Sequence, residues 1–388
     1  MLKNKWIILV IICLTTLAII GGDAMIAPIT QPIAEEYGFA QSGFMGTTSA
    51  LVNAVFVILC GIFLTIFNRK TLTIASMAFF VIIGTIAIIL SSAGVGTIIP
   101  YIMIFALCGA PQGMLTVLNA STIKEHFSED QRAKAQGFYT ASIAIMAIVV
   151  LNAGGFLAVG GMFGTFKIFL LAIPILAALF FIPKANEQIV EEKKEKFTLN
   201  KQIFKDGIKL WILVAIFQMI YQFFFQFLGL VFAFKTINVP MSMAVGFGVT
   251  PIFIGVLIAG FIFGLVYKKL QEKTVFLNFV LATAGLGIIF FAPNLIIVGI
   301  GTLLLGAMYC FSFSYGFLKA GLLNQNPTTM ITITSLVMAL SAFAAPHIFN
   351  LIALIFSMNH LQILPIIAGM TAVGAALNFR KNKQIIAN

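Results

Sequence analysis

Long apolar runs, separated by short polar clusters, follow one another along the whole chain. Many of the runs hold about 18 or more residues without a charge, enough for a helix to cross a hydrocarbon layer of roughly 30 Å. The pattern therefore predicts about twelve membrane-spanning helices. Their predicted ranges are 6–34, 43–67, 71–92, 97–123, 133–159, 166–183, 210–234, 242–266, 274–292, 294–318, 328–357 and 360–379.

The composition favours the same interpretation. Of the 388 residues, 61% are hydrophobic and only 9% are charged. Soluble domains average about 45–50% apolar and about 25% charged residues, so this chain lacks the charge to cover a surface in water. We expect an all-α polytopic membrane protein. The N-terminal apolar stretch is too long for a signal peptide and is interpreted as the first span.

The basic residues fall in alternate connections between the predicted spans. All of them except Lys167 and Lys235 lie on one side of the membrane if the N-terminus is cytoplasmic. Since positive residues concentrate in cytoplasmic loops, both termini are predicted to be cytoplasmic and the number of spans to be even. The net charge of +11 is then a topology signal, and no nucleic-acid partner is expected.

One long charged stretch, residues 184–209, divides the spans into two halves of nearly equal length. We predict an N-terminal six-helix bundle over 1–183, a cytoplasmic linker over 184–209 and a C-terminal six-helix bundle over 210–388. The second span of each half ends in a similar sequence, GIFLTIFNRK in the first half and GFIFGLVYKK in the second. Such a repeat is typical of transporters built from two bundles related by a pseudo-two-fold axis.

These features resemble the major facilitator superfamily over essentially the whole chain. The turn after the second span is similar to the family pattern Gly-x-Leu-Ala-Asp-Arg-x-Gly-Arg-Arg at Gly61, Arg69 and Lys70, although Thr65 and Ile66 replace the acidic residue and the first arginine. The family's latch between helix ends is therefore expected to be weakened. The resemblance implies transport by alternating access, with both bundles rocking around a central site.

Two further motifs bear on the subclass. The turn after the fourth span resembles the pattern Phe-x-x-x-x-Arg-x-x-Ala-x-Gly, with Phe127, Arg132 and Gly137 in place. The arginine that many drug exporters carry in the fourth span would fall near Gly109 and is absent here. The sequence LNAGG in the fifth span matches their fifth-span motif only in part. The candidate gating residues implied by the resemblance are Gly61, Arg69, Lys70 and Arg132.

Asp23 is the acidic residue nearest to the middle of a predicted span. A charge at that depth costs roughly 2.5–3.5 kcal/mol, which is usually accepted only where the group faces water or a partner. Asp23 is therefore interpreted either as a proton acceptor that couples transport or as a counter-charge for a cationic solute. The alternative is a carboxylate that only hydrogen-bonds a helix broken near Pro28.

Amides, tyrosines and a serine at membrane depth are the candidate substrate-binding residues. Gln218, Gln222 and Gln226 recur every fourth residue and so share one helix face. Hydrogen bonding between helices is the alternative role for such groups. The full candidate set is Asn53, Gln112, Asn119, Asn152, Gln218, Tyr221, Gln222, Gln226, Tyr309, Ser312, Tyr315 and Asn350. His347 is the histidine well inside a span and is a second proton-coupling candidate, with a packing role as its alternative.

Together these observations predict a proton-coupled secondary transporter for a small neutral or cationic organic solute. No lysine or arginine lies deep in a predicted span, which argues against strongly anionic substrates. A multidrug efflux antiporter is the alternative within transport, and a passive facilitator or non-transporting membrane sensor is the alternative of another class. We expect a monomer in the cell membrane, with the lipid bilayer, protons and the solute as partners, and no enzyme activity, cofactor or metal.

Overall fold

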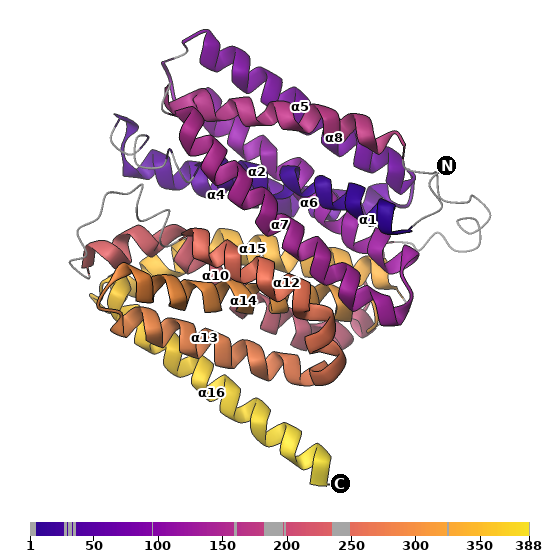
Figure 1. The fold of residues 1–388 in the computed structure, drawn as a ribbon, viewed down its shortest axis with the longest axis vertical. Helices are drawn as coiled ribbons and strands as arrows, with labels where there is room; N and C mark the ends of the chain where they lie inside the picture. Colours follow the sequence, from indigo (N-terminus) through magenta and orange to yellow (C-terminus); the bar gives the residue numbers. More distant parts are fainter. Residues whose placement is uncertain are drawn as a thin grey trace. The chain divides into compact units, whose positions relative to one another are not determined.

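The computed structural model describes residues 5–26, 29, 33, 36–94, 96–158, 161–181, 197, 199–234, 249–323 and 326–387. Within these ranges every regular element is a helix (Figure 1). The side chains of residues 39–44, 46, 162, 225–234 and 379–387 lie outside the description. An all-helical chain is what the apolar runs predict, because a helix satisfies its own backbone hydrogen bonds inside a membrane.

A helix or a pair of helices lies at each of the twelve predicted spans. The first half holds α1 (Lys5–Leu14), α2 (Thr16–Ile26), α4 (Phe39–Phe63), α5 (Arg69–Ser92), α6 (Ile99–His126), α7 (Glu129–Ala158), the 3₁₀ helix η2 (Met162–Leu171) and α8 (Ala172–Leu179). The second half holds α10 (Lys201–Phe234), α12 (Thr250–Leu270), the 3₁₀ turn η4 (Gln271–Lys273), α13 (Thr274–Phe291), α14 (Leu295–Ala320), α15 (Pro327–Ile355) and α16 (His360–Ala387).

The length and hydropathy of these helices fit membrane crossing. In the described residues, nine helical segments are long and apolar enough to span, and one of them, Thr250–Phe291, contains both α12 and α13. Two shorter apolar helices, Thr47–Phe63 and Phe163–Leu179, accompany them. The prediction of a polytopic membrane protein is therefore confirmed.

The first predicted span is broken earlier than the sequence suggested. The α-helix stops at Leu14 and resumes at Thr16, and the Thr15 hydroxyl donates to the Ile12 carbonyl at 2.7 Å. A hydroxyl that bonds its own backbone competes with the helical pattern, which accounts for the break. Pro28, where the break was expected, lies outside the described residues.

The chain forms two compact units. The first unit comprises Met1–Glu129, Ile145–Trp211 and Phe317–Phe343, and the second comprises Asp130–Ala144, Ile212–Gly316 and Ala344–Asn388. Each unit therefore takes a segment from the other half of the sequence. The bundle boundaries 1–183 and 210–388 stay a prediction.

In the first unit, glycines bring α4 and α6 into backbone contact. A Cβ atom on Gly109 would lie 2.0 Å from the Ser49 carbonyl oxygen, and one on Gly113 would lie 2.5 Å from the Asn53 carbonyl oxygen. The spacing Gly-x-x-x-Gly places both glycines on one face of α6, where small residues permit close packing. On α2, Gly22 is similarly tight, since its Cβ would lie 2.9 Å from Cys108 Cβ. Helices α2, α4 and α6 therefore meet around one point.

In the second unit, α12 contacts both α7 and α14 through glycines. A Cβ atom on Gly137 would lie 2.4 Å from the Gly260 carbonyl oxygen, and one on Gly264 would lie 3.0 Å from Lys134 Cα. On the other side of α12, a Cβ on Gly255 would lie 2.0 Å from the Leu303 carbonyl oxygen. These contacts pack the start of α7 and the middle of α14 closely against α12.

Candidate functional site

Asp23 lies where α2, α4 and α6 meet, and its carboxylate accepts two hydrogen bonds. Ser49 Oγ donates to one carboxylate oxygen at 2.9 Å, and Gln112 Nε2 donates to the other at 3.1 Å. Both donors are neutral, and the Asp23 side chain is only partly buried. The arrangement holds a carboxylate at membrane depth without neutralising its charge, which leaves the group able to bind a proton or a cation.

Glycine packing places the two donors on Asp23. Gly109 sets Ser49 against α6, and Gly113 lies next to Gln112 and touches Asn53. The structure thus brings Asp23, Gln112 and Asn53 into one region of the first unit, and their role in binding or coupling stays a prediction. Ser49 was missed, although it lies one helical turn before Asn53 and so shares its face.

Asn119 is part of a different contact of the first unit. Its side chain is buried, and its Nδ2 donates to Thr15 Oγ1 at 2.9 Å. The bond joins α6 to the break between α1 and α2. Asn119 therefore fixes the segment that leads to Asp23, and its role in binding a solute stays a prediction.

Asn152 is exposed on α7 and donates to the Ile148 carbonyl of its own helix at 2.7 Å. Nothing in the described part of the first unit brings it to the Asp23 carboxylate, whose hydrogen bonds go to Ser49 and Gln112. Its assignment as a substrate-binding residue stays a prediction.

Aromatic and amide candidates gather in the second unit. Tyr221 of α10 stacks on Tyr309 of α14, with ring centroids 3.9 Å apart and an interplanar angle of 19°. Gln218, one turn before Gln222, is buried, and Gln222 is partly buried. The side chain of Gln226 lies outside the description.

The other α14 candidates lie toward its end. Ser312 is buried, and Tyr315 donates its hydroxyl to a Glu272 carboxylate oxygen. Tyr315 therefore bonds a residue of η4, and its role in binding a solute stays a prediction.

The two α15 candidates are exposed. His347 is exposed, and the Asn350 side-chain oxygen lies 3.0 Å from His360 Nε2 at the start of α16. His347 belongs to the second unit and Asp23 to the first, so the proposed relay between them stays a prediction.

The family of this chain follows from its similarity to known proteins. The family model described as Major Facilitator Superfamily matches residues 12–346. This chain belongs to the major facilitator superfamily. No curated protein sequence matches the chain.

Several solved structures share the fold. The proton:xylose symporter XylE from E. coli, bound to 6-bromo-6-deoxy-D-glucose, has a TM-score of 0.72 at 15% identity and covers 96% of this chain and 94% of its own. The human organic anion transporter MFSD10 has a TM-score of 0.74 at 11% identity, covering 95% and 98%. A single-residue variant of the E. coli fucose:proton symporter FucP has a TM-score of 0.68 at 12% identity, covering 96% and 98%. At these identities the likeness shows the two-bundle superfamily fold alone.

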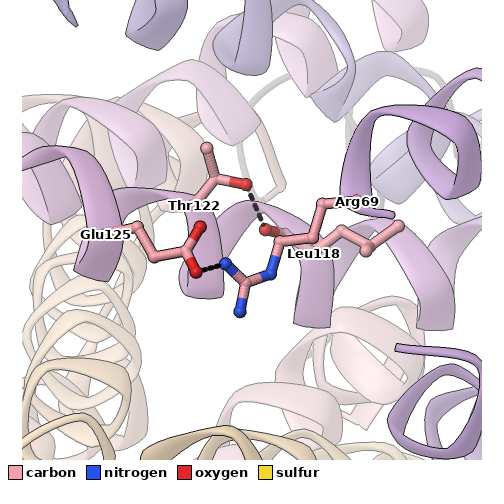
Figure 2. Close-up of polar contacts among 4 residues, drawn as sticks. All are labelled: Arg69, Leu118, Thr122 and Glu125. Atoms are coloured by element: carbon pink, nitrogen blue, oxygen red, sulfur yellow. Dashed lines mark hydrogen bonds and ion pairs between the residues drawn. The ribbon is translucent and has the colours of Figure 1, made fainter. Parts of the chain in front are cut away.

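The superfamily turn after the second span carries an ion pair in this chain. Arg69, the first residue of α5, pairs with Glu125 near the end of α6 (Figure 2). Thr65, which replaces the family's acidic residue, donates to the Ile62 carbonyl of its own turn at 2.7 Å. Although Thr65 replaces the family's acidic residue, Glu125 of α6 supplies a carboxylate to Arg69 at this turn. The expected weakening of the latch stays a prediction.

The same turn is also tied to α8. Lys70 Nζ donates to the Phe180 carbonyl oxygen, one residue beyond the end of α8, at 2.9 Å. Asn68 caps α5, since its Oδ1 accepts from the Thr71 amide at 2.8 Å. Arg69 and Lys70 thus fasten one turn to two other helix ends. Arg132 lies half-buried near the start of α7 in the second unit, and its gating role stays a prediction.

The Arg69–Glu125 pair is expected to contribute little to stability in water. The two side chains are 25% and 41% exposed, so solvent screens the pair, and exposed ion pairs typically contribute about 0.2–1 kcal/mol. We expect a double-mutant cycle of Arg69→Ala and Glu125→Ala on thermal unfolding to give a coupling free energy in that range. The coupling should shrink in high salt. A coupling that is salt-independent and several times larger would contradict this assessment.

Proposed function

We propose that this protein is a secondary active transporter that moves a small neutral or cationic organic solute by alternating access and couples the movement to protons. The observation that carries the proposal is the Asp23 carboxylate between the neutral donors Ser49 and Gln112. Among the described residues no cationic side chain pairs with Asp23. Its charge is therefore available to a proton or to a cationic group of the solute.

The physical basis of coupling is the cost of an ionised carboxyl at membrane depth. Two hydrogen bonds to neutral donors offset part of that cost, and protonation removes the charge. A solute whose binding favours one protonation state of Asp23 is thereby linked to proton binding, because the linkage is reciprocal. The proton symporters for xylose and fucose show that proteins of this fold are associated with such coupling, which supports the proposal.

The proposed solute class follows from the charges and from the polar groups available. Amides and tyrosines of α10 and α14 offer neutral hydrogen-bond donors and acceptors together with aromatic faces, and these suit neutral and cationic molecules. The fold also occurs in an organic anion transporter, so the fold alone does not select the solute charge. The sequence favours a neutral or positively charged solute over an anion, since the ionisable group nearest to mid-span is the acidic Asp23.

Close contacts at the ends predicted to be cytoplasmic support alternating access. In the second unit, Gly137 at the start of α7 touches Gly260 of α12, and Thr140 and Ser314 share a hydrogen bond of 2.8 Å between α7 and α14. In the first unit, a Cβ on Gly61 near the end of α4 would lie 3.0 Å from Thr332 Cγ2 near the start of α15. Each contact joins the two sequence halves within one compact unit, which supports the proposal that these helix ends come together in one state of the transport cycle.

A bulky substitution at the α7–α12 contact should therefore disfavour the state in which these helix ends are together. A Cβ on Gly260 would lie 2.7 Å from both Ala141 Cβ and the Gly137 carbonyl oxygen, so Gly260→Leu cannot keep the α7–α12 contact. We expect the rate of solute uptake in proteoliposomes to fall by about tenfold or more, because one half of the cycle is blocked.

Gly287→Leu is the matched control for this variant. Gly287 lies on α13, and a Cβ there meets nothing within 4 Å, so the same substitution adds a side chain without a steric conflict. The control should transport at close to the wild-type rate. Equal rates for Gly260→Leu and wild-type protein would remove the α7–α12 contact from the gate.

The proposed function is tested in two steps on the purified full-length protein. A thermal-shift screen of neutral, cationic and anionic metabolites first identifies solutes that stabilise it, because a ligand that binds the folded state raises the unfolding temperature. Proteoliposomes with an internal pH-sensitive dye then report whether the solute moves protons. Solute-dependent proton flux supports the proposal. Solute movement without proton flux would identify a facilitator, and stabilisation mainly by strong anions would contradict the proposed solute class.

A further inference from the structure

We propose that Glu272 is a positioning residue that, through Tyr315, holds the end of α14 against α12 so that both helices present one surface to α7. The Tyr315 hydroxyl donates to a Glu272 carboxylate oxygen. Glu272 lies in η4, the short turn between α12 and α13, and Tyr315 lies in the last two turns of α14. This inference depends on the alternating-access part of the proposed function and not on the solute or on protons.

Helices α12 and α14 are packed differently along their length. Where the beginning of α12 meets the middle of α14, glycines allow the backbones to touch, since a Cβ on Gly306 would lie 1.9 Å from the Ile252 carbonyl oxygen. Toward their ends rings separate them. Phe263 lies 6.1 Å from Phe311 and Tyr267 lies 6.2 Å from Tyr315, measured between ring centroids. Ring contacts are less directional than hydrogen bonds, so the Tyr315–Glu272 bond fixes the spacing at the end where the backbones diverge.

The backbone of the turn is in an unusual conformation next to Glu272. Gln271, the residue immediately before Glu272, has φ 45° and ψ −117°, a conformation that residues with a Cβ atom seldom adopt. Such conformations persist where the surroundings hold them in place. A strained residue beside a charge-assisted hydrogen bond indicates that the direction of the Glu272 side chain is a fixed feature of this turn.

The surface that this bond would maintain is the one in contact with α7. From α12, Gly260 and Gly264 pack on the start of α7. From α14, Ser314 bonds Thr140, and Phe313 lies 6.3 Å from Tyr139 between ring centroids. Ser314 directly precedes Tyr315, so a displacement of Tyr315 displaces the α14 part of this surface. Glu272 is thereby linked to a contact made by other residues.

The first unit contains a related contact between helix ends, in which the donor and the acceptor have exchanged places. There the donor, Arg69, begins the helix after the turn and the acceptor, Glu125, lies near the end of the next helix. In the second unit the acceptor, Glu272, lies just before α13 and the donor, Tyr315, lies near the end of α14. The Tyr315–Glu272 contact carries one charge, whereas the Arg69–Glu125 pair carries two, and the donor Tyr315 is buried. A buried donor is less screened by salt, so the two contacts should respond differently to ionic strength.

The test is hydrogen–deuterium exchange on the full-length protein in lipid nanodiscs, without solute and without a pH gradient. We expect Tyr315→Phe and Glu272→Ala each to raise amide exchange by about tenfold in residues 268–275, because a hydrogen bond to a charged group is lost. Exchange should also rise in residues 130–141 of α7, which pack on α12 and α14 through Gly137, Tyr139 and Thr140. The double variant should exceed neither single variant, since both remove the same bond.

Matched controls separate this role from general loosening. Thr302→Val removes a hydroxyl from the same helix, one that among the described residues bonds only the Gly299 carbonyl of its own helix. Lys273→Ala removes a charged side chain next to Glu272. Both variants should stay within about twofold of wild-type exchange. Exchange that rises in 268–275 but not in 130–141 would reduce Glu272 to a local structural residue and overturn the proposal. Additive effects in the double variant, or single variants that match their controls, would overturn it as well. Because no solute or proton gradient is used, these outcomes are independent of a failure of proton coupling.

Discussion

Replacing Asp23 by Asn should abolish proton-driven accumulation of the solute while solute binding and solute exchange persist. The amide preserves the size of the side chain, so the packing of α2 against α4 and α6 should be retained. It cannot bind or release a proton, and therefore solute movement loses its link to the proton gradient. We expect accumulation against a concentration gradient in proteoliposomes to fall to the level of empty vesicles, and counterflow exchange to remain measurable.

The matched control is Asp206→Asn. Asp206 is a partly exposed carboxyl near the start of α10, where it accepts a hydrogen bond from Gln202 at 2.7 Å. The Asp206→Asn variant should transport the solute at the wild-type rate. Ser49→Ala removes one donor from the carboxylate and should shift the pH dependence of accumulation without abolishing it. Unchanged proton-driven accumulation in Asp23→Asn would exclude Asp23 from coupling.

Introducing a branched side chain at Gly109 should have the largest effect on stability. A Cβ there would lie 2.0 Å from the Ser49 carbonyl oxygen and 2.7 Å from the Asn53 backbone nitrogen. Both atoms belong to the backbone of α4, which cannot move aside as a flexible side chain can. Gly109→Val must therefore separate α4 from α6. Overpacking of this kind costs about 1–3 kcal/mol or more, and the apparent unfolding temperature should fall by roughly 3–10 °C.

The same variant should also weaken solute binding, because Ser49 and Gln112 reach Asp23 from the two helices that it separates. Gly287→Val is the control, since it carries the same helix-propensity cost at a position with open space around its Cβ. Thermal unfolding and thermal-shift binding on both variants separate packing from propensity. If Gly109→Val is as stable as Gly287→Val and binds the solute normally, the close packing of α4 on α6 is not what positions the donors.

The architecture could be predicted largely from the sequence because membrane insertion imposes simple constraints. Apolar runs of sufficient length must become helices, and the loops between them carry the basic residues. The twelve spans and the superfamily follow from those two rules together with motifs such as Phe127 and Arg132. The break at Thr15 was not predictable in the same way, since threonine is common inside membrane helices and only its own hydrogen bond to Ile12 reveals the interruption.

The contacts around Asp23 could be anticipated only in part, and the site itself stays a prediction. Asp23 and Gln112 were selected because an acid and an amide at membrane depth are costly, and the structure brings them together. Ser49 gave a weaker signal, because a hydroxyl can bond its own helix backbone at little cost. Glu125 and Glu272 gave no such signal, since they lie in the charged connections between the predicted spans. Their pairing with Arg69 and Tyr315 depends on how helix ends meet, which local sequence does not encode.

The central claim is that Asp23 itself takes up and releases a proton at membrane depth, and infrared titration of the full-length protein in lipid tests it most directly. Acidification of the wild-type protein should produce the absorption band of a protonated carboxylic acid in a weakly hydrated environment. We predict that this band disappears in Asp23→Asn and remains in Asp206→Asn. A band that survives unchanged in Asp23→Asn would assign the proton to another group and contradict the account.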